Sequence, residues 1–231
     1  TGALAGDHKV MRTIVLNEGV AVVDSMDELF DVTAVLTAYP KPPAGAAGVV
    51  TNSGAIRSLT LDFADRIGLP IAALSVAAQL DLGQLLSTHL QVDNPLDIGT
   101  AGFANPSIFG TTAEAMLKDD GVGTVLLAHV GGSPSMQVAK ADAILPAVAA
   151  SRKPVLLTIT GDDYALDPVF MSKVQESGVP FFRSLERSLR AMSHVARYAR
   201  TLDAVRVNDV EHGTRAAVPC LEHEAKAMLA D

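Results

Sequence analysis

The chain has 231 residues, of which 48% are hydrophobic and 19% are charged, and this balance is typical of a folded protein and not of a disordered chain. The 18 Lys and Arg residues against 26 Asp and Glu residues give a formal net charge of −8, and no basic cluster offers a footprint for a nucleic-acid backbone. We therefore expect about one and a half domains of folded chain that bind no DNA or RNA.

The single cysteine, Cys220, excludes an intrachain disulfide, a zinc-binding cysteine pair and a redox dithiol. Each apolar run is interrupted within about ten residues, short of the roughly 20 that a membrane-spanning helix needs, and the first residues lack a signal-peptide pattern. These features predict a cytoplasmic protein without a membrane span. The chain begins with Thr1 and its last apolar spacing breaks off at Asp231, so we expect an excised or truncated piece of a longer chain.

The first part of the chain is predicted to form a helix, a strand and a second helix. Apolar residues at helical spacing over 7–18 end at a glycine, a common helix stop, and the β-branched run 20–24 predicts a strand. Ser25 and Glu28 have the capping-box spacing that opens the next helix. The Pro and Gly residues of 39–46 then indicate a domain boundary.

Residues 46–200 alternate short apolar runs with amphipathic segments, which predicts a parallel sheet covered by helices on both faces. We interpret this region as a flavodoxin-like, doubly wound α/β domain, followed at 203–219 by a polar linker. The five strand-like runs lie at 47–50, 71–74, 124–130, 154–160 and 180–182, and the helix-like segments that follow them lie at 54–67, 76–88, 134–150, 167–177 and 184–200, with one more helix at 106–118.

Ligands of open α/β sheets bind beyond the carboxyl ends of the strands, so the loops there carry the candidate residues. In TNSGA (51–55) a strand runs into a helix through small residues: Gly54 permits close approach and Ser53 offers a hydroxyl. The free N–H groups of a helix start bind anions. The loop lacks both the GxGxxG spacing and the lysine of a Walker loop. The residues alone leave open a phosphate or carboxylate site and a plain Asn/Ser helix cap.

Three further loops carry candidate residues: two follow predicted strands, and NPLDIG lies in the long connection before the helix at 106–118. GGSP (131–134) could complete the same anion site or form an ordinary strand–helix turn. NPLDIG (94–99) contains an Asn-Pro turn and Asp97, which could orient a ligand, but a turn-stabilising carboxylate is the favoured role. TGDD (160–163) places two adjacent acids after a strand, where a solvated turn is favoured over a Mg²⁺ site.

The six histidines share no metal-ligand spacing with one another or with the cysteine, and we predict no metal site. His129 ends a buried-looking strand just before the glycine pair. A histidine with satisfied hydrogen bonds is the favoured interpretation, and contact with an anion or proton transfer stays open. Ser53 stands at a strand–turn–helix corner, but the absence of GxSxG and of an acid–histidine pair in order argues against a hydrolase nucleophile.

Strings along nearly the whole chain resemble the NDP-forming (ADP-forming) acyl-CoA synthetases, relatives of succinyl-CoA synthetase. TGALAG (1–6) and VAVVDSMDELFDVTAVL (20–36) resemble the end of the phosphohistidine-bearing domain of this family. The flavodoxin-like CoA-ligase domain that follows is matched by GVVTNSGA (48–55), NPLDIG (94–99), KPVLLTITGDD (153–163) and GVPFFRSLERSLRAM (178–192). CLEHEAKAML (220–229) resembles the opening of the ATP-grasp domain.

The resemblance implies an enzyme that joins a carboxylic acid to coenzyme A while it cleaves ATP or GTP, with Mg²⁺, through a phosphohistidine. The family histidine immediately precedes the Thr-Gly, so it would stand before Thr1 and this chain would hold no catalytic residue. In the family two helix starts clasp the phosphate. This chain departs from the family pattern at Ala55, where relatives often have a second glycine. The implied phosphate-binding residues are Asn52, Ser53, Gly54, Ala55, Gly131 and Gly132.

The resemblance also implies how the chain is divided. Residues 1–40 would be the C-terminal part of the phosphohistidine-bearing domain, a second α/β domain, residues 46–200 the CoA-ligase domain, and residues 201–231 a linker and the start of an ATP-grasp domain. The expected partners are the CoA-binding and ATP-grasp domains of the same polypeptide or of a partner subunit and a small carboxylic acid, with a homo-oligomer left open. The fragment alone is expected to be inactive.

Two other functions stay open at this point. One is a non-catalytic ligand-binding or regulatory module of an acetyltransferase fusion, which a residue other than histidine before Thr1 would favour. The other is a free flavodoxin-like protein that binds a small phosphorylated ligand.

Overall fold

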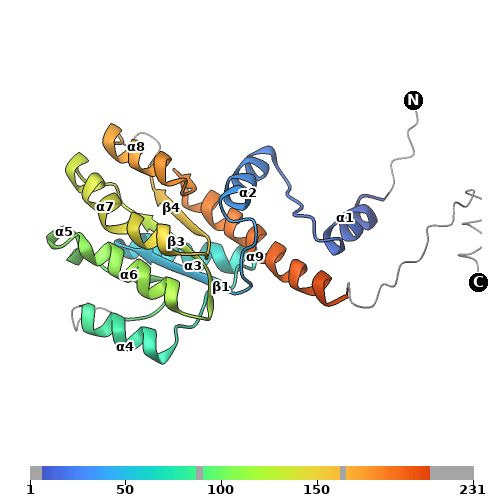
Figure 1. Ribbon diagram of the computed structural model, residues 1–231, viewed down its shortest axis with the longest axis horizontal. Helices are drawn as coiled ribbons and strands as arrows, with labels where there is room; N and C mark the ends of the chain where they lie inside the picture. Colours follow the sequence, from blue (N-terminus) through green and yellow to red (C-terminus); the bar gives the residue numbers. More distant parts are fainter. Residues whose placement is uncertain (1–6, 87–90, 162–164, 209–231) are drawn as a thin grey trace, which may run out of the picture.

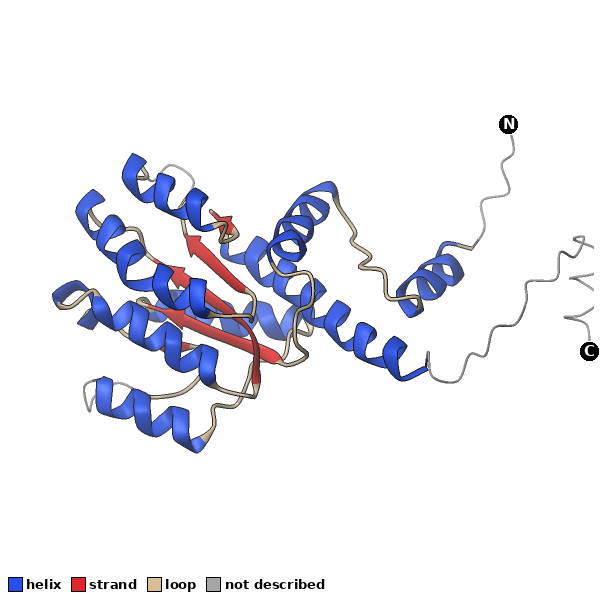
Figure 2. Ribbon diagram, in the orientation of Figure 1, coloured by secondary structure: helices blue, strands red, loops and turns tan. Residues whose placement is uncertain are grey.

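The computed structural model describes residues 7–86, 91–161 and 165–208. Its strands are β1 Ala46–Thr51, β2 Leu96–Asp97, β3 Val122–His129, β4 Val155–Ile159 and β5 Phe181–Phe182. Its helices are α1 His8–Asn17, α2 Met26–Ala38, α3 Gly54–Ile67, α4 Val76–Leu85, α5 Ala101–Ala104, α6 Ser107–Lys118, α7 Pro134–Ala150, α8 Pro168–Ser177 and α9 Leu185–Asn208. Figures 1 and 2 show the strands as one central layer between helices. None of the helices described here is both long enough and apolar enough to cross a bilayer.

The five strands form one sheet in the order β2-β1-β3-β4-β5, and every neighbouring pair is parallel. This is the strand order of the flavodoxin-like fold, so the predicted fold class is confirmed. From β1 the chain moves to one edge of the sheet through β2 and then returns to β3 on the other side of β1. The topological switch point therefore lies between the carboxyl ends of β1 and β3.

Each face of the sheet has its own hydrophobic core. On one face the sheet packs against α4, α6, α7 and α8 through residues such as Leu82, Phe109 and Ile144, all at most 1% exposed. On the other face α3 and α9 contribute Phe63, Leu189 and their neighbours, and Val35 of α2 joins the same core. The central strands β3 and β4 are buried along their whole length, which is why their sequences are continuous apolar runs.

One predicted strand is replaced by another at the edge of the sheet. The run 71–74 forms only an isolated bridge, between Ala47 and Ile71, whereas β2 lies in the segment that we expected to be a connection. The side chain of Asn94 explains the exchange. It accepts from the N–H of Val49 at 2.9 Å and donates to the carbonyl oxygens of Ala47 and Ala72 at 2.8 and 2.9 Å, so an amide side chain takes the ladder bonds that a longer strand would make. The short helix α5 was not predicted either.

The predicted strand at 20–24 is wrong. This run connects α1 to α2 without a ladder partner among the described residues, and Val20 is 50% exposed. A β-branched run becomes a strand only where a neighbouring strand accepts its backbone bonds. The capping box that follows does form: Ser25 Oγ accepts from the N–H of Glu28 at 3.2 Å, and the Glu28 carboxylate accepts from the N–H of Asp24 at 2.8 Å, one residue before the cap.

The predicted linker at 203–219 is also wrong over the part that is described, because α9 continues to Asn208. No Gly or Pro interrupts this helix, and polar side chains alone do not end a helix. Residues 209–219 lie outside the described part of the chain, as do the two ends that carry TGALAG and CLEHEAKAML.

Candidate functional site at the switch point

The loops after β1 and β3 are joined by one side chain. Thr51 and Ala128 are register partners at the ends of these strands, and Asn52 Oδ1 then accepts from the N–H of Val130 at 2.9 Å. The bond fixes the start of α3 beside the glycine loop that precedes α7. The two groups of residues predicted to bind phosphate, 52–55 and 131–132, are thus neighbours in the fold.

The start of α3 is not capped by a side chain. Ser53 occupies the N-cap position with extended backbone (φ −151°, ψ 119°), and its hydroxyl makes no cap hydrogen bond. The plain serine cap that the sequence left open is therefore not formed. Gly54 and Ala55 are exposed. The first turn of α3 consequently presents amide N–H groups and the positive end of the helix dipole to whatever lies beyond the sheet.

Three buried polar atoms at the ends of β1 and β3 have no hydrogen-bond partner within the described part of the chain. They are Thr51 Oγ1, Asn52 Nδ2 and His129 Nε2. The three residues are 0%, 8% and 1% exposed. A buried polar atom without a partner costs free energy and is uncommon in folded proteins. All three residues lie at the carboxyl ends of these neighbouring strands, the place where open α/β sheets bind ligands, and we take them as candidate ligand contacts.

His129 is not the histidine with satisfied hydrogen bonds that the sequence favours, because its Nε2 has no partner among the described residues. Its ring is buried against the edge of Phe109, with the ring centroids 4.7 Å apart. Burial, with a smaller contribution from the positive charge of Lys140, lowers the pKa of His129 to about 3. The side chain is therefore neutral at physiological pH. In this state one ring nitrogen is a donor and the other an acceptor.

The glycine loop, which contains Gly131 and Gly132, connects β3 to α7 and is held by a side chain of α7. Gly132 adopts φ +79°, a conformation that favours glycine, and Ser133 Oγ accepts from the N–H of Met136 at 3.3 Å to cap α7. The ammonium of Lys140, in the second turn of α7, donates to the carbonyl oxygens of Val130 and Gly131, the latter at 3.0 Å. A helix thus reaches back to hold the loop from which it starts.

Sequence reasoning missed Lys140. The side chain is 2% exposed, and its Nζ lies 5.6 Å and 5.1 Å from the ring centroids of Phe103 and Phe109. Burial lowers the pKa of Lys140 to about 8. A signal was available in the sequence, because Lys140 shares the buried stripe of α7 with Ala141 and Ile144, and a cation on an apolar helix face is unusual.

The two acidic loops have different outcomes. Asp97 Oδ1 accepts from the N–H of Gly99 at 2.9 Å, which confirms its predicted role in the turn. Its other carboxylate oxygen lies beside the start of α3, 3.4 Å from the place that a Cβ on Gly54 would take. Asp162 and Asp163 of TGDD lie outside the described residues. Within the described ranges, no group of three or more His, Cys, Asp or Glu side chains could hold a metal ion.

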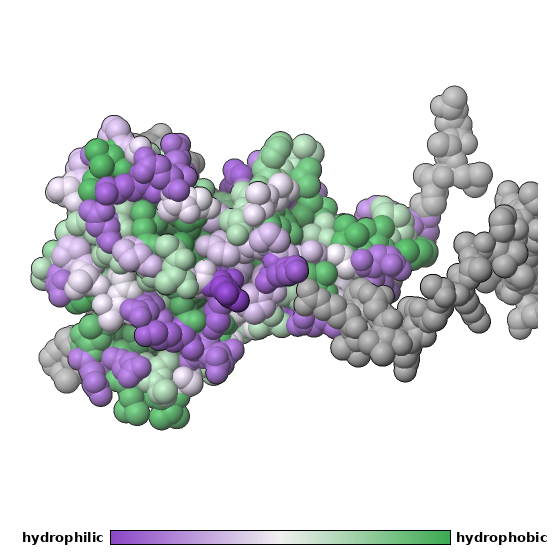
Figure 3. All heavy atoms as spheres, in the orientation of Figure 1, coloured by the Kyte–Doolittle hydropathy of each residue, from purple (hydrophilic) through white to green (hydrophobic). Residues whose placement is uncertain are grey.

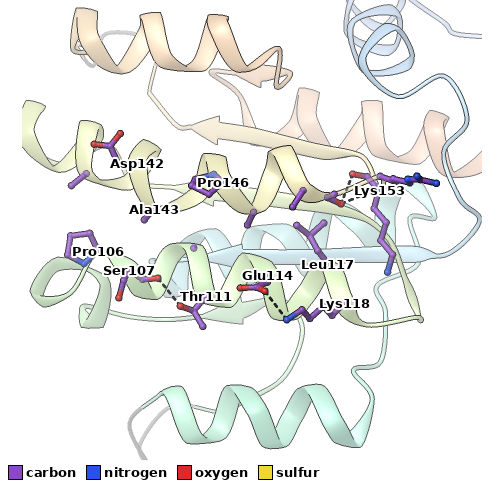
Figure 4. A pocket seen from close by; sticks show the side chains of 16 residues that line it. Pro106, Ser107, Thr111, Glu114, Leu117, Lys118, Asp142, Ala143, Pro146 and Lys153 are labelled. Atoms are coloured by element: carbon purple, nitrogen blue, oxygen red, sulfur yellow. Dashed lines mark hydrogen bonds and ion pairs between the residues drawn. The ribbon is translucent and has the colours of Figure 1, made fainter.

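A separate cavity lies away from the switch point. A groove of about 940 Å³ runs between α6 and α7 and is lined in part by Pro106, Thr111 and Pro146 (Figure 4). Its charged residues are partly paired, as in the ion pair of Glu114 with Lys118 at 2.8 Å. The groove does not include the switch-point loops, and it brings no candidate catalytic residues together.

No family model matches the chain, but sequence comparison finds relatives. The chain is 29% identical over 198 residues to a trans-feruloyl-CoA synthase from an unknown prokaryotic organism, covering 85% of this chain and 28% of the relative. It is 28% identical over 209 residues to acetate–CoA ligase [ADP-forming] I of Archaeoglobus fulgidus, and the match covers 90% of this chain and 29% of that ligase. With subunit alpha of acetate–CoA ligase [ADP-forming] II of Pyrococcus furiosus the identity is 30% over 122 residues, covering 53% and 26%.

The homologues of this chain are ADP-forming acyl-CoA synthetases and related CoA ligases. The chain spans less than a third of the length of the three synthetases compared above. Among solved structures, a dinucleotide-forming acetyl-coenzyme A synthetase 1 of Ca. Korarchaeum cryptofilum, in complex with phosphate and ADP, superposes with a TM-score of 0.74 at 20% identity, covering 92% of this chain and 45% of that one. A protein of Pyrococcus horikoshii OT3 gives 0.70 at 24% identity, covering 86% and 45%. Both likenesses show the fold.

Proposed function

We propose that this chain is one part of an NDP-forming acyl-CoA synthetase, and that its switch-point site holds the phosphate of a phosphohistidine that precedes Thr1 in the longer protein. The observation that carries the proposal is the hydrogen bond between Asn52 and Val130. Because of this bond, an uncapped helix start and a glycine loop are neighbours, as a site for a multiply charged anion requires.

The geometry supports each proposed phosphate contact. Gly54 and Ala55 would donate backbone N–H groups from the first turn of α3, and Ser53 would donate its hydroxyl, which no cap bond occupies. Asn52 would donate through Nδ2, the buried amide nitrogen that lacks a partner among the described residues. Gly131 and Gly132 would supply N–H groups from the facing loop. Together these donors would stabilise the anion through hydrogen bonds and the dipole of α3, without an arginine.

The remaining activity belongs to the whole protein. We propose that the complete synthetase joins a small carboxylic acid to coenzyme A in the cytoplasm, with ATP or GTP and Mg²⁺, and that CoA-binding and ATP-grasp domains supply those sites. We further propose that the isolated chain is inactive as a ligase.

We also propose the domain division 1–40, 46–200 and 201–231, with α9 extending past the second boundary to Asn208. The support is the apolar surface of the N-terminal helices, visible around α1 and α2 in Figure 3. No residue of α1 is buried, and on α2 the side chains of Met26 and Phe30 are 63% and 64% exposed. Helices that expose such faces belong to a domain whose other elements cover them.

The first experiment measures whether the 231-residue chain binds inorganic phosphate. We expect phosphate to shift the backbone amide NMR signals of Gly54, Ala55 and Gly131 and to leave those of the α6–α7 groove unchanged. The second experiment uses the complete synthetase and compares Gly54→Asp with Gly83→Asp. Gly83 is an exposed glycine inside α4, and the space that a Cβ would take there is open, so both variants add one carboxylate to a helix.

Gly54→Asp places its carboxylate where the phosphate must bind, beside Asp97. We expect it to reduce histidine phosphorylation at least about hundredfold, since it combines lost contacts with like-charge repulsion, and Gly83→Asp to retain phosphorylation. Unchanged phosphorylation in Gly54→Asp would refute the proposal. Phosphate binding in a parent polypeptide that has no histidine before Thr1 would instead support the regulatory module of an acetyltransferase fusion.

A further inference from the structure

Lys140 is a buried cation without a counter-ion among the residues that the structure describes. No carboxylate in the described part of the chain lies within ion-pair distance of its Nζ, and its polar contacts are the carbonyl oxygens of Val130 and Gly131. Carbonyl oxygens and aromatic faces stabilise an ammonium, but they carry no net charge. A protein that retains an unneutralised charge in its interior gives up stability, so we expect this charge to have a function.

The two hydrogen bonds of Lys140 also orient the peptides of the glycine loop. In a trans peptide the C=O and N–H bonds point in opposite directions. The carbonyl of Val130 shares a peptide with the N–H of Gly131, and the carbonyl of Gly131 shares one with the N–H of Gly132. Because both carbonyls point toward the ammonium of Lys140, the two N–H groups point away from it.

We propose that Lys140 is the positioning residue of the phosphate site: it sets the two N–H groups of the glycine loop toward the anion, and the anion in turn neutralises its charge. This inference rests on the proposed function of the switch-point site. It assigns the orientation of the glycine loop to a side chain inside α7. It also explains why a lysine lies in the buried stripe of α7. A neutral side chain of the same length would fill the space without orienting the peptides.

The test compares Lys140→Met with Lys153→Met in the 231-residue chain. Both substitutions remove one lysine charge and one ammonium that donates to a backbone carbonyl, since Lys153 Nζ donates to the carbonyl oxygen of Asp119 at 2.7 Å. Lys153 precedes β4 and therefore lies at the opposite, amino end of the sheet. The dissociation constant of inorganic phosphate is measured at pH 7 by NMR titration of the Gly54 and Gly131 amides.

We expect Lys140→Met to weaken phosphate binding at least about tenfold, which corresponds to the loss of one nearby charge, and Lys153→Met to retain wild-type affinity. Equal affinity of wild type and Lys140→Met would overturn the role of Lys140 and leave the phosphate site standing. Absence of phosphate binding by the wild-type chain would reject the site, and the role of Lys140 with it. The two failures are therefore distinguishable.

A pH profile provides a readout that a purely structural lysine would not give. Sulfate keeps its charge over this range, so it replaces phosphate as the probe between about pH 6.5 and about pH 9.5. Wild-type affinity should fall as Lys140 loses its proton, because burial lowers its pKa to about 8, and Lys140→Met should lack this fall. The titratable neighbour coupled to Lys140 among the described residues is His129, which stays neutral throughout. Parallel profiles of the two proteins would contradict the proposal.

Discussion

Asn52 Oδ1 accepts a hydrogen bond from the N–H of Val130 at 2.9 Å, across 78 positions of sequence. One amide side chain thereby joins the two loops of the switch point with its oxygen and leaves its nitrogen without a partner in the described structure. The two atoms have separable roles, because the oxygen serves the fold and the nitrogen is available to a ligand.

Substitutions at Asn52 should separate these roles. Asn52→Asp keeps an oxygen for Val130, so we expect the free energy of unfolding to change by less than about 1 kcal/mol. It also adds a negative charge at the site, so phosphate binding should be lost. Asn52→Ala should lower both the stability, by about 1 kcal/mol, and the affinity. Denaturant unfolding and phosphate titration check both, and retained phosphate binding in Asn52→Asp would show that the anion does not contact this side chain.

Acid should destabilise the fold through His129. Its folded pKa of about 3 lies below the unfolded value of about 6.5. Between these values the unfolded chain binds a proton that the folded chain does not. The free energy of unfolding therefore falls by about 1.4 kcal/mol for each pH unit below 6.5 on account of this residue. His129→Leu should remove this contribution and flatten the dependence measured by denaturant unfolding between about pH 7 and about pH 5.

The matched control for His129 is His8→Leu, which removes an exposed histidine from α1. An equal change of the pH dependence in both variants would contradict the assignment to His129. The comparison holds the number of histidines constant, so the burial of the side chain is the one difference that is tested.

The contact between α2 and α9 should depend on Arg187. Its Nε and Nη2 donate to the two oxygens of Asp31 at 2.9 and 2.7 Å, and Asp31 is 7% exposed. Arg187→Met leaves that carboxylate buried without this partner, and we expect a loss of about 1 to 3 kcal/mol together with faster hydrogen exchange in α2. The control Lys118→Met breaks the exposed pair with Glu114 and should change neither quantity. Undiminished protection of α2 in Arg187→Met would refute the prediction.

The exposed apolar face of α2 should make the isolated chain self-associate at high concentration. Phe30→Lys removes the aromatic side chain of this face, and we expect the dissociation constant of self-association to rise at least about tenfold, since a buried Phe contributes about 1.5 to 3 kcal/mol. Leu59→Lys is the control, because Leu59 is 57% exposed on α3. Sedimentation velocity measures the change. An equal effect of both substitutions would show that the association is not specific to α2.

Sequence patterns alone predicted the fold class and most of the elements. Apolar runs that are buried on both sides, such as β3 and β4, reveal parallel strands because their composition records burial. Helix starts were predictable for a similar reason, since Ser25 and Ser133 each accept from a backbone N–H three residues away. These are local interactions, and each is encoded within a short stretch of chain.

The tertiary structure decided what depends on distant partners. The run 20–24 has strand propensity but no neighbouring strand among the described residues, and 71–74 loses its place at the sheet edge to Asn94 and β2. At the site, the sequence indicated the positions 52–55 and 131–132, whereas the unpartnered atoms of Thr51, Asn52 and His129 and the inward turn of Lys140 became visible only in three dimensions. Propensity is a property of nearby residues, but satisfaction of a hydrogen bond or a charge depends on which residues folding brings together.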